Sequence, residues 1–524
     1  MERGAVAGTQ RAIGGGLALR QGGDHRMRVS DLRCSLIAGL AAAGLITGAC
    51  GDHGTGTGPG GSSLQLLYGD GATDTVLSVP AQALVVEVRG ENGVPVPGTV
   101  VRFQSLPIDS AHPFAPGVFV AAVTSTYFET FVADSTDSRG RSSVLIELGT
   151  SSGAAKLLVS VPEFGLQDTA RFTVLPGNAA RVVVQPKDTA LYTGKGFRAR
   201  ASVTDRFGNP RSDPVSYSTT TVAITITPSG TVTAGANFAR AFYTANARGW
   251  TDTGWVSVVP QGTLAALQTG DFGGHGAGMV MFNLDGSGYQ WIGPGGSYYN
   301  AAPSWTPSGT ALAFGLTSGG VGSWIYTSDL SGAERPLITA GDSGLTLTSW
   351  PAYSHDGAYV YFSGATTANF GLWRADADGT NPHLLYTDPS GLAWRSSPSP
   401  DGTRLAFTNA GTYAAGVQVY TLASNTVSTW AVVGHTPRWS PVAETIAFVT
   451  PYGGSVFVMN SDGTGVRQVT SVGRFYGETS LTWSSDGAWL VARGPASLEL
   501  LNVTTGATLP LGYTTSIIEP AWKP

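Results

Sequence analysis

Apolar residues between positions 64 and 262 come in short runs of β-branched side chains, separated by turns rich in Gly, Pro, Asn and Asp. No helical spacing of apolar positions runs through this region. Two segments, residues 84–103 and 201–218, share one plan: a strand, a Gly/Asn/Pro hairpin and a second strand with partial alternation. Runs of this type predict β-strands, and the repeated plan predicts two copies of one β-sandwich module.

From residue 263 onward the pattern changes to a repeat of about 38–48 residues, the period expected for four-stranded propeller blades. Each copy has an anchor residue before a turn and an apolar strand, as in residues 354–357 before residues 360–362. A Gly or Asn hairpin, such as residues 376–379, alternates with the anchors. The six anchors, which predict six blades, are Trp305, Tyr353, Pro398, Trp439, Trp483 and Trp522.

The sixth anchor, Trp522, is followed by no segment that can serve as the second strand of its blade. Residues 263–267 fit this vacancy, because their sequence matches the second strand at residues 403–407. A ring closed in this way leaves no open sheet edge. The predicted fold is therefore all-β, with two β-sandwich modules followed by a six-bladed β-propeller that its N- and C-terminal strands close.

The turn motifs of both regions resemble known families. The sandwich hairpins, together with residues 228–234 (Pro-Ser-Gly-Thr-Val-Thr-Ala), resemble bacterial immunoglobulin-like domains of groups 1 and 2. The anchor turns resemble the Trp-Ser-Pro-Asp-Gly core of TolB-type β-propellers, although Pro398 replaces an aromatic residue and residues 442–444 break one copy. The first resemblance implies spacer or adhesive modules. The second implies protein binding or scaffolding at the cell envelope, without naming a partner.

The N-terminal region carries the pattern of a bacterial secretion signal. Residues 35–49 are apolar and follow two Arg residues. About fifteen residues at ~1.5 Å each are too few to cross a ~30 Å membrane core, so this run is expected to be a signal segment. Small residues Gly48 and Ala49 directly before Cys50 resemble the lipobox of lipoproteins, which implies a lipid on Cys50. The alternative is an ordinary cleaved signal followed by an incidental Cys.

Met27 is the expected start of the natural chain, because Met1 gives the signal an unusually long leading segment. The predicted division is an upstream extension and signal peptide at 1–49, a flexible tether at 50–63, immunoglobulin-like domains at 64–177 and 178–262, and the propeller at 263–524.

Composition narrows the classes of partner. Only 12% of the 524 residues are charged, against a usual ~25%, and the net charge is −5. The absence of Lys/Arg clusters excludes nucleic-acid binding, which requires a basic surface. Cys34 and Cys50 both lie near the N-terminus, so no disulfide within the chain and no thiolate metal site is expected beyond Gly51. No cofactor is expected.

Two short motifs with possible chemistry lie within the repeats. Residues 341–344, Gly-Asp-Ser-Gly, match the nucleophile motif of chymotrypsin-like proteases, but a ring of repeats is not that fold. We therefore expect Ser343 in a loop between blades. Residues 376–381 resemble the start of a calcium loop but lack its closing Glu, and their place in a hairpin already explains them. We predict no catalytic residue and no metal site.

One set of candidate site residues remains. In TolB-type propellers the innermost strand of each blade ends at the anchor, so the resemblance implies that residues just before the anchors line the central channel. These residues either bind a ligand or peptide, or they are channel residues that pair with one another. A third alternative is acid–base work on a glycan by Glu478 and Glu519. The candidates are Asn300, Trp350, Arg395, His435, Glu478 and Glu519.

The sequence thus predicts a lipid-anchored protein of the cell envelope that binds or scaffolds through its propeller and is not an enzyme. Its predicted partners are the membrane, through the lipid, and an unknown envelope protein or glycan. One alternative is a carbohydrate-active enzyme. Another is surface adhesion through the sandwich modules, which requires an exposed apolar or aromatic patch on residues 64–262. The sequence does not indicate the oligomeric state.

Overall fold

The computed structural model describes residues 56–57, 61–108, 117–269, 277–292, 302–317, 323–339, 341–387, 393–409, 416–451, 454–470, 481–495, 497–511 and 516–524. The chain divides into two compact units. The first comprises residues 1–181 with 203–212, and the second comprises residues 182–202 with 213–524. Within the described residues the helical elements are three 3-10 turns: Glu91–Gly93, Pro162–Phe164 and Asp342–Gly344.

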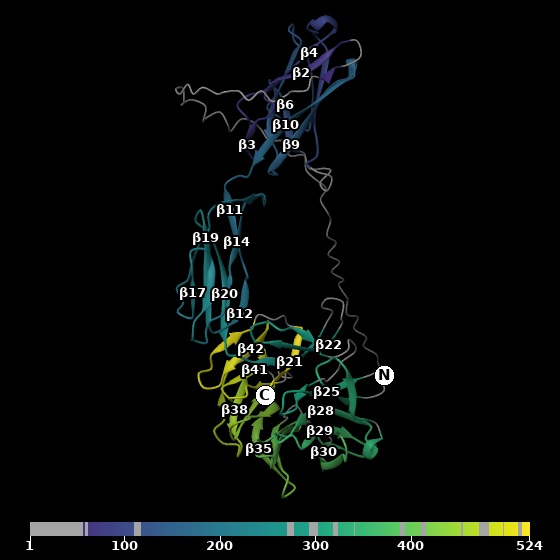
Figure 1. The fold of residues 1–524 in the computed structure, drawn as a ribbon, viewed down its shortest axis with the longest axis vertical. Helices are drawn as coiled ribbons and strands as arrows, with labels where there is room; N and C mark the ends of the chain where they lie inside the picture. Colours follow the sequence, from purple (N-terminus) through teal and green to yellow (C-terminus); the bar gives the residue numbers. More distant parts are fainter. Residues whose placement is uncertain are drawn as a thin grey trace, which may run out of the picture. The chain divides into compact units, whose positions relative to one another are not determined.

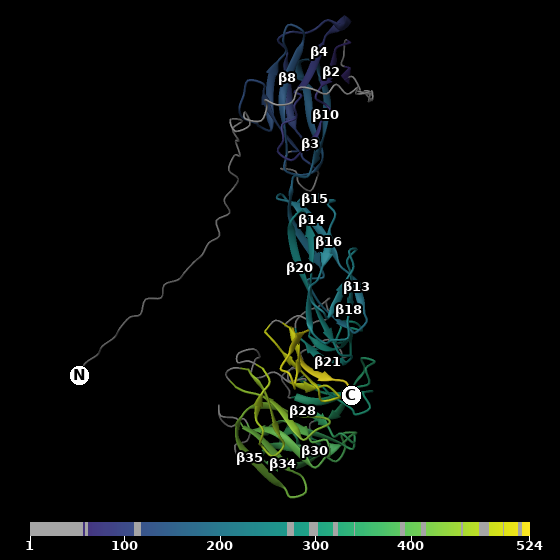
Figure 2. The same ribbon diagram turned by 90° about the vertical axis from the view of Figure 1, so that its left-hand side faces the viewer.

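The first unit contains a sandwich of two five-stranded sheets. Figure 2 shows β2, β4 and β8 of one sheet beside β10 of the other. One sheet holds, in order, β1 (Gly56–Thr57), β2 (Ser63–Tyr68), β4 (Leu84–Arg89), β8 (Arg141–Leu148) and β6 (Val118–Ala122). The other holds β3 (Thr73–Thr75), β10 (Leu166–Leu175), β9 (Gly153–Val161), β5 (Val100–Ser105) and β7 (Phe131–Ser135).

Alternation along the strands builds the core of this sandwich. In β8 every second residue is buried, as expected for a strand with one face on a core. Leu84, Val86 and Val88 of one sheet pack with Phe103 and Leu157 of the other in a single continuous hydrophobic cluster. The first sandwich therefore has one core of its own.

The following strands form three smaller sheets. The first is β11 (Ala179–Gln185), β14 (Arg200–Asp205) and β15 (Pro210–Arg211). The second is β12 (Asp188–Tyr192), β20 (Trp250–Val259), β19 (Arg240–Ala247) and β16 (Ser216–Ser218). The third is β13 (Gly196–Arg198), β18 (Thr231–Ala234) and β17 (Ile224–Ile226). The all-β prediction is confirmed for these strands. Their immunoglobulin-like character remains a prediction.

Six four-stranded sheets follow, and each is one blade of the predicted propeller. From the innermost strand outward, blade 1 is β44 (Ile517–Trp522), β21 (Thr263–Gln268), β22 (Gly278–Asn283), β23 (Gln290–Trp291). Blade 2 is β24 (Ser304–Trp305), β25 (Leu312–Thr317), β26 (Ser323–Ser328), β27 (Glu334–Ile338). Blade 3 is β28 (Leu347–Tyr353), β29 (Tyr359–Ala365), β30 (Phe370–Asp376), β31 (His383–Thr387).

Blade 4 is β32 (Ala393–Pro398), β33 (Arg404–Asn409), β34 (Gly416–Thr421), β35 (Thr426–Val433). Blade 5 is β36 (His435–Trp439), β37 (Thr445–Val449), β38 (Val456–Asn460), β39 (Arg467–Gln468). Blade 6 is β40 (Thr482–Trp483), β41 (Trp489–Arg493), β42 (Leu498–Asn502), β43 (Thr508–Pro510). In all six blades the predicted anchor is the last residue of the innermost strand.

The predicted closure of the ring is confirmed. β21 pairs antiparallel with β44, with Leu264 opposite Trp522 and Ala265 opposite Ala521. Figure 1 shows the yellow C-terminal strands β41 and β42 beside the teal β21. Gly262 lies against this pairing, and a Cβ added there would come within 2.4 Å of the Trp522 ring. A residue without a side chain is therefore required where the two ends of the ring meet.

The propeller core is divided among the contacts between blades. Six hydrophobic clusters each combine residues of two neighbouring blades. On β21, Ala265 and Leu267 pack with blade 2, whereas Leu264 and Ala266 pack with blade 6. Each blade thus depends on both neighbours for the burial of its apolar side chains.

Strands β12 and β20 pack on the closure of the ring. Ala190 and Val259 belong to the hydrophobic cluster between blades 1 and 6. The Tyr192 hydroxyl donates a hydrogen bond to the Gly262 carbonyl at 2.8 Å and accepts one from the Leu284 N–H at 3.1 Å. Within the second unit these contacts tie the sandwich strands directly to the propeller.

The predicted start at Met27 and the predicted lipid site at Cys50 lie outside the described residues. In the part of the chain that the structure describes, no helix is both long and apolar enough to cross a membrane.

Candidate functional site

The innermost strands share an unusual backbone turn three residues before the anchor. The residues at this position have a positive φ, which non-glycine residues rarely adopt. In blades 1, 3, 4 and 5 strand pairing shifts register at the same point, for example between Ser349 and Ala352, so these four strands carry a β-bulge. The residues and their φ angles are Ala302 (31°), Trp350 (51°), Arg395 (56°), Thr436 (51°) and Glu519 (52°).

This backbone feature corrects the register of the predicted channel residues. Trp350, Arg395 and Glu519 do occupy the shared bulge position. His435 does not, because it comes one residue before the bulge at Thr436. The prediction therefore combined different register positions. In blade 2 the equivalent residue is Ala302 and not Asn300; Asn300 and Glu478 themselves lie outside the described residues.

Three of the candidates meet inside the channel. Arg395 Nη2 lies 3.3 Å from Glu519 Oε1, and both side chains are largely buried. The Arg395 guanidinium also lies 5.5 Å from the centre of the Trp350 ring, which stacks at 4.4 Å on Trp394. These contacts match the alternative in which channel residues pair with one another.

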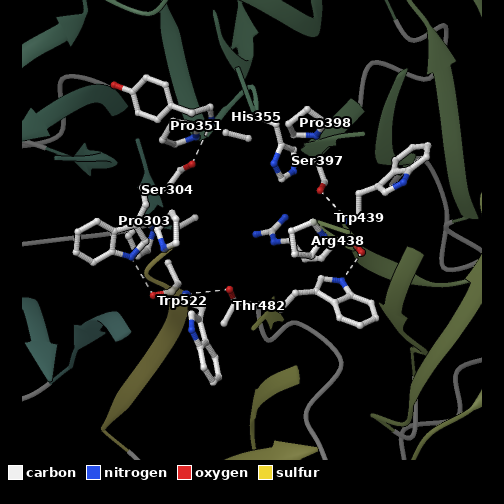
Figure 3. A pocket seen from close by; sticks show the side chains of 18 of the residues that line it. Pro303, Ser304, Pro351, His355, Ser397, Pro398, Arg438, Trp439, Thr482 and Trp522 are labelled. Atoms are coloured by element: carbon white, nitrogen blue, oxygen red, sulfur yellow. Dashed lines mark hydrogen bonds between the residues drawn. The ribbon is translucent and has the colours of Figure 1, made fainter. Parts of the chain in front are cut away.

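A cavity of about 410 Å³ opens at the anchor end of the channel, and all six blades line it. All six anchors and all six residues that directly precede them are among the lining residues. Figure 3 shows Pro303, Pro351 and Pro398 around the opening. Proline, alanine and tryptophan side chains alternate in the wall with hydroxyl-bearing and charged side chains.

The residues directly before the anchors also join the blades. Where this residue is Ser or Thr, its hydroxyl accepts a hydrogen bond from the N–H of the next anchor. At Arg438 and Ala521 the main-chain carbonyl instead accepts from the indole of the next anchor. The hydroxyl bonds are Tyr353 N to Ser304 (3.1 Å), Trp439 N to Ser397 (2.9 Å) and Trp522 N to Thr482 (2.9 Å). The indole bonds are Trp305 Nε1 to Ala521 (3.1 Å) and Trp483 Nε1 to Arg438 (2.9 Å).

Arg438 is the one charged residue among the six that precede the anchors. It was not among the site residues predicted from the sequence. Its guanidinium points into the cavity (Figure 3). Nε donates to the Leu481 carbonyl at 3.1 Å and Nη1 to the Pro437 carbonyl at 3.3 Å. Burial lowers the pKa of Arg438 to about 10; Arg395 also lowers it, and Glu519 raises it. At neutral pH the group therefore remains a cation.

Two further polar groups line the cavity near Arg438. The His355 ring also points inward (Figure 3), and burial lowers its pKa, which the Asp356 carboxylate partly offsets. Ser396 is 2% exposed, and its hydroxyl has no hydrogen-bond partner among the described residues. Most blades with a described residue at this position carry proline there, so Ser396 places a hydroxyl where the other blades have an apolar residue.

The two motifs set aside in the sequence have structural roles. Ser343 lies in a 3-10 turn after the last strand of blade 2, and its hydroxyl donates to the Pro382 carbonyl at 2.7 Å. Asp378 accepts a hydrogen bond from the Thr380 N–H at 3.0 Å, and Asp376 accepts from Asn381 Nδ2 at 2.6 Å, both within one hairpin. Within the described ranges, no cluster of three or more His, Cys, Asp or Glu residues has metal-binding geometry.

Exposed aromatic residues do occur in the sandwich region, as surface adhesion requires. Trp250 is 50% exposed and Trp255 is 40% exposed. However, the Trp255 ring is already contacted by the Arg240 guanidinium at 5.1 Å and the Phe242 ring at 5.5 Å. The Trp255 ring is therefore less open to a ligand than its exposed area suggests.

Known proteins resemble parts of this chain in sequence or in fold. No protein family profile matches this chain. An uncharacterized protein of Agrobacterium fabrum is 30% identical over 83 residues, a stretch that makes up 16% of this chain and 27% of that protein. The matched stretch thus spans about a quarter of that relative's length.

Solved structures that resemble this chain include two TolB-type proteins. TolB from Acinetobacter baumannii gives a TM-score of 0.43 at 16% identity, over 59% of this chain and 83% of that one. A putative TolB from Agrobacterium tumefaciens gives 0.36 at 15% identity, over 48% and 89%. An oligogalacturonate lyase in complex with manganese gives 0.31 at 17% identity, over 48% and 74%. Because these likenesses are low, the propeller assignment rests on the strand pairing of this chain.

Proposed function

We propose that this chain is a binding protein of the cell envelope whose propeller holds its ligand in the cavity at the anchor end of the channel. The observation that carries the proposal is that cavity. Its volume of about 410 Å³ lies in the range of small-molecule sites, and its wall combines apolar side chains with polar and charged groups. The lipid anchor on Cys50 and the spacer role of the sandwich modules are part of the same proposal.

Binding fits the cavity better than glycan cleavage does. A glycosidase needs two carboxyl groups on either side of the bond that it breaks. Glu519 is the one Asp or Glu among the described lining residues, and Arg395 already pairs with it. Glu478, the other residue of the predicted pair, lies outside the described residues. Glu519 therefore has a partner that competes with a catalytic role.

The test is affinity capture from solubilised envelope with the full-length chain as bait, in three forms. Ser485 is exposed at the rim of the cavity, so Ser485→Trp fills the opening without altering a buried residue. Ser308 is also exposed but does not line the cavity, so Ser308→Trp is the matched control.

We expect the wild type and Ser308→Trp to capture the same molecule and Ser485→Trp to lose it. If all three forms capture the same set, binding does not use the cavity. If the wild type captures nothing reproducible, the proposed function is wrong.

A further inference from the structure

We propose that the ligand presents a carboxylate to Arg438, as the C-terminal residue of a peptide does. This inference rests on the proposed function and specifies the chemistry of the ligand. It is carried by the position and the unfilled hydrogen-bonding capacity of the Arg438 guanidinium.

Within the described part of the chain, the Arg438 guanidinium still has a free hydrogen-bond donor on the side that faces the cavity. Its Nε and Nη1 donate to two main-chain carbonyls, of Leu481 and Pro437. Both acceptors are neutral, and Nη2 has no hydrogen-bond partner among the described residues. Two fixed bonds hold the planar group in one orientation, with its remaining donor edge toward the cavity. A guanidinium held in this way is suited to bind a carboxylate, which accepts charge-assisted hydrogen bonds.

The charge near Arg438 is also unbalanced. No ion pair joins Arg438 to a carboxyl group of the described residues. The nearby Glu519 is engaged by Arg395, so its charge is already matched. Lys523 adds a second positive charge to the lining, 5.3 Å from the centre of the Trp305 ring. A partly buried cation without a carboxylate partner is costly, and an incoming anion would reduce that cost.

The hydroxyls of the wall favour a peptide over a sugar. A sugar needs partners for several hydroxyls, but the hydroxyls of Ser304, Ser397 and Thr482 already accept hydrogen bonds from the next blades. A peptide that ends in a carboxylate is therefore a better match than a sugar acid.

The test uses the full-length chain immobilised on resin and two pools of random N-acetylated hexapeptides. One pool has free C-terminal carboxylates and the other has C-terminal amides. Retention of each pool is measured by mass spectrometry, and galacturonate is the competitor that represents a sugar acid. Variants Arg438→Met and Arg438→Lys are compared with the wild type after a thermal melt has shown that they fold.

We expect the wild type to retain free-acid peptides about tenfold or more over amides, as the loss of a charge-assisted hydrogen bond predicts. Arg438→Met should abolish this preference, and Arg438→Lys should keep part of it. Equal retention of acids and amides overturns the carboxylate inference but leaves a Ser485→Trp-sensitive binding function intact. Displacement of the peptides by galacturonate at equal concentration, or retention of neither pool, overturns the peptide assignment.

Discussion

The first sandwich and the propeller each contain an enclosed charged group, and the two are treated differently. In the sandwich, Glu87 is 3% exposed and accepts hydrogen bonds from Arg141 at 2.8 Å and from Arg89. Burial raises the pKa of Glu87, but the bonds from Arg141 and Arg89 together outweigh burial and lower it. In the propeller, Arg438 has two main-chain carbonyls and no carboxylate partner among the described residues.

The difference separates a structural charge from a binding site. A charge whose partners are supplied by its own domain contributes to stability and leaves nothing for a ligand. A charge with an unfilled donor costs stability until an anion arrives. The two regions also differ in core organisation, because the sandwich has one cluster and the propeller has six that close on themselves.

The largest expected effect is on the ring closure. Trp522→Ala removes a large side chain from the cluster between blades 1 and 6 and should lower the free energy of unfolding of the propeller by about 3–5 kcal/mol. All 13 tryptophans lie between residues 250 and 522, so tryptophan fluorescence during urea unfolding reports on the second unit alone. Trp250→Ala, at a residue 50% exposed, is the control and should change little. An equal loss in both variants would contradict a core shared around the ring.

The next largest effect on stability concerns Glu87, the paired charge of the first sandwich. Glu87→Gln keeps the shape of the side chain but removes its charge, and it should destabilise the first sandwich by roughly 1–2 kcal/mol. The value is modest because both arginines remain partly solvated, with side-chain exposures of 43% and 37%. Far-UV circular dichroism during urea unfolding measures the loss. No loss would mean that the pairing of Glu87 is not structural.

The lowered pKa of Glu87 predicts that the stability of the first sandwich depends on pH. The pKa of Glu87 is lower in the folded chain than its ordinary value of 4.5, so its contribution is fully present above that value. Stability should fall as the pH drops below 4.5 and through the lowered pKa. Glu87→Gln should show a smaller fall over this window than the wild type does. Parallel curves for the two proteins would count against the assigned shift.

Removal of the Arg438 charge should have the opposite effect on stability. Arg438→Met removes a partly buried cation without a carboxylate partner and should raise the free energy of unfolding of the propeller by about 1 kcal/mol, while binding is lost. Tryptophan fluorescence during urea unfolding measures the gain. A destabilisation as large as that of Glu87→Gln would show that Arg438 is a structural charge, and the contrast between the two regions would fail.

The smallest effect tests the hydrogen bonds between blades. Ser397→Ala deletes the hydroxyl that accepts from the Trp439 N–H at 2.9 Å and should cost about 1 kcal/mol. Ala352→Ser is the matched variant. It places a hydroxyl at the equivalent position of blade 3, where the next anchor is Pro398, which has no N–H to donate, so it should give no gain. A gain in stability there would mean that the hydroxyl acts in another way.

The blades and their closure could be predicted from sequence because the anchors recur at a regular period and each ends an innermost strand. The bulge could not, because Ala302, Trp350, Arg395, Thr436 and Glu519 share a backbone conformation but no side-chain type. This is why His435 was taken for an equivalent position.

Arg438 was missed for a related reason, although a signal for it existed. The residues before the six anchors alternate between a hydroxyl-bearing and another residue, and a lone arginine stands out among them once the anchors are aligned. The enclosure of its guanidinium depends on walls from all six blades, which no local pattern encodes.

The pairing of β21 with β44 also has a kinetic consequence. Gln268 and its hydrogen-bond partner Ser516 are separated by 248 residues, so at ~5–20 residues per second the first strand waits roughly 12–50 s on the ribosome for its partner. During that time Leu264 and Ala266 have no neighbour from blade 6. Val259 and Ala190 precede them in the chain and pack in the same cluster. Strands β12 and β20 are synthesised before the ring, so they are available to cover its unfinished end until the last strand arrives.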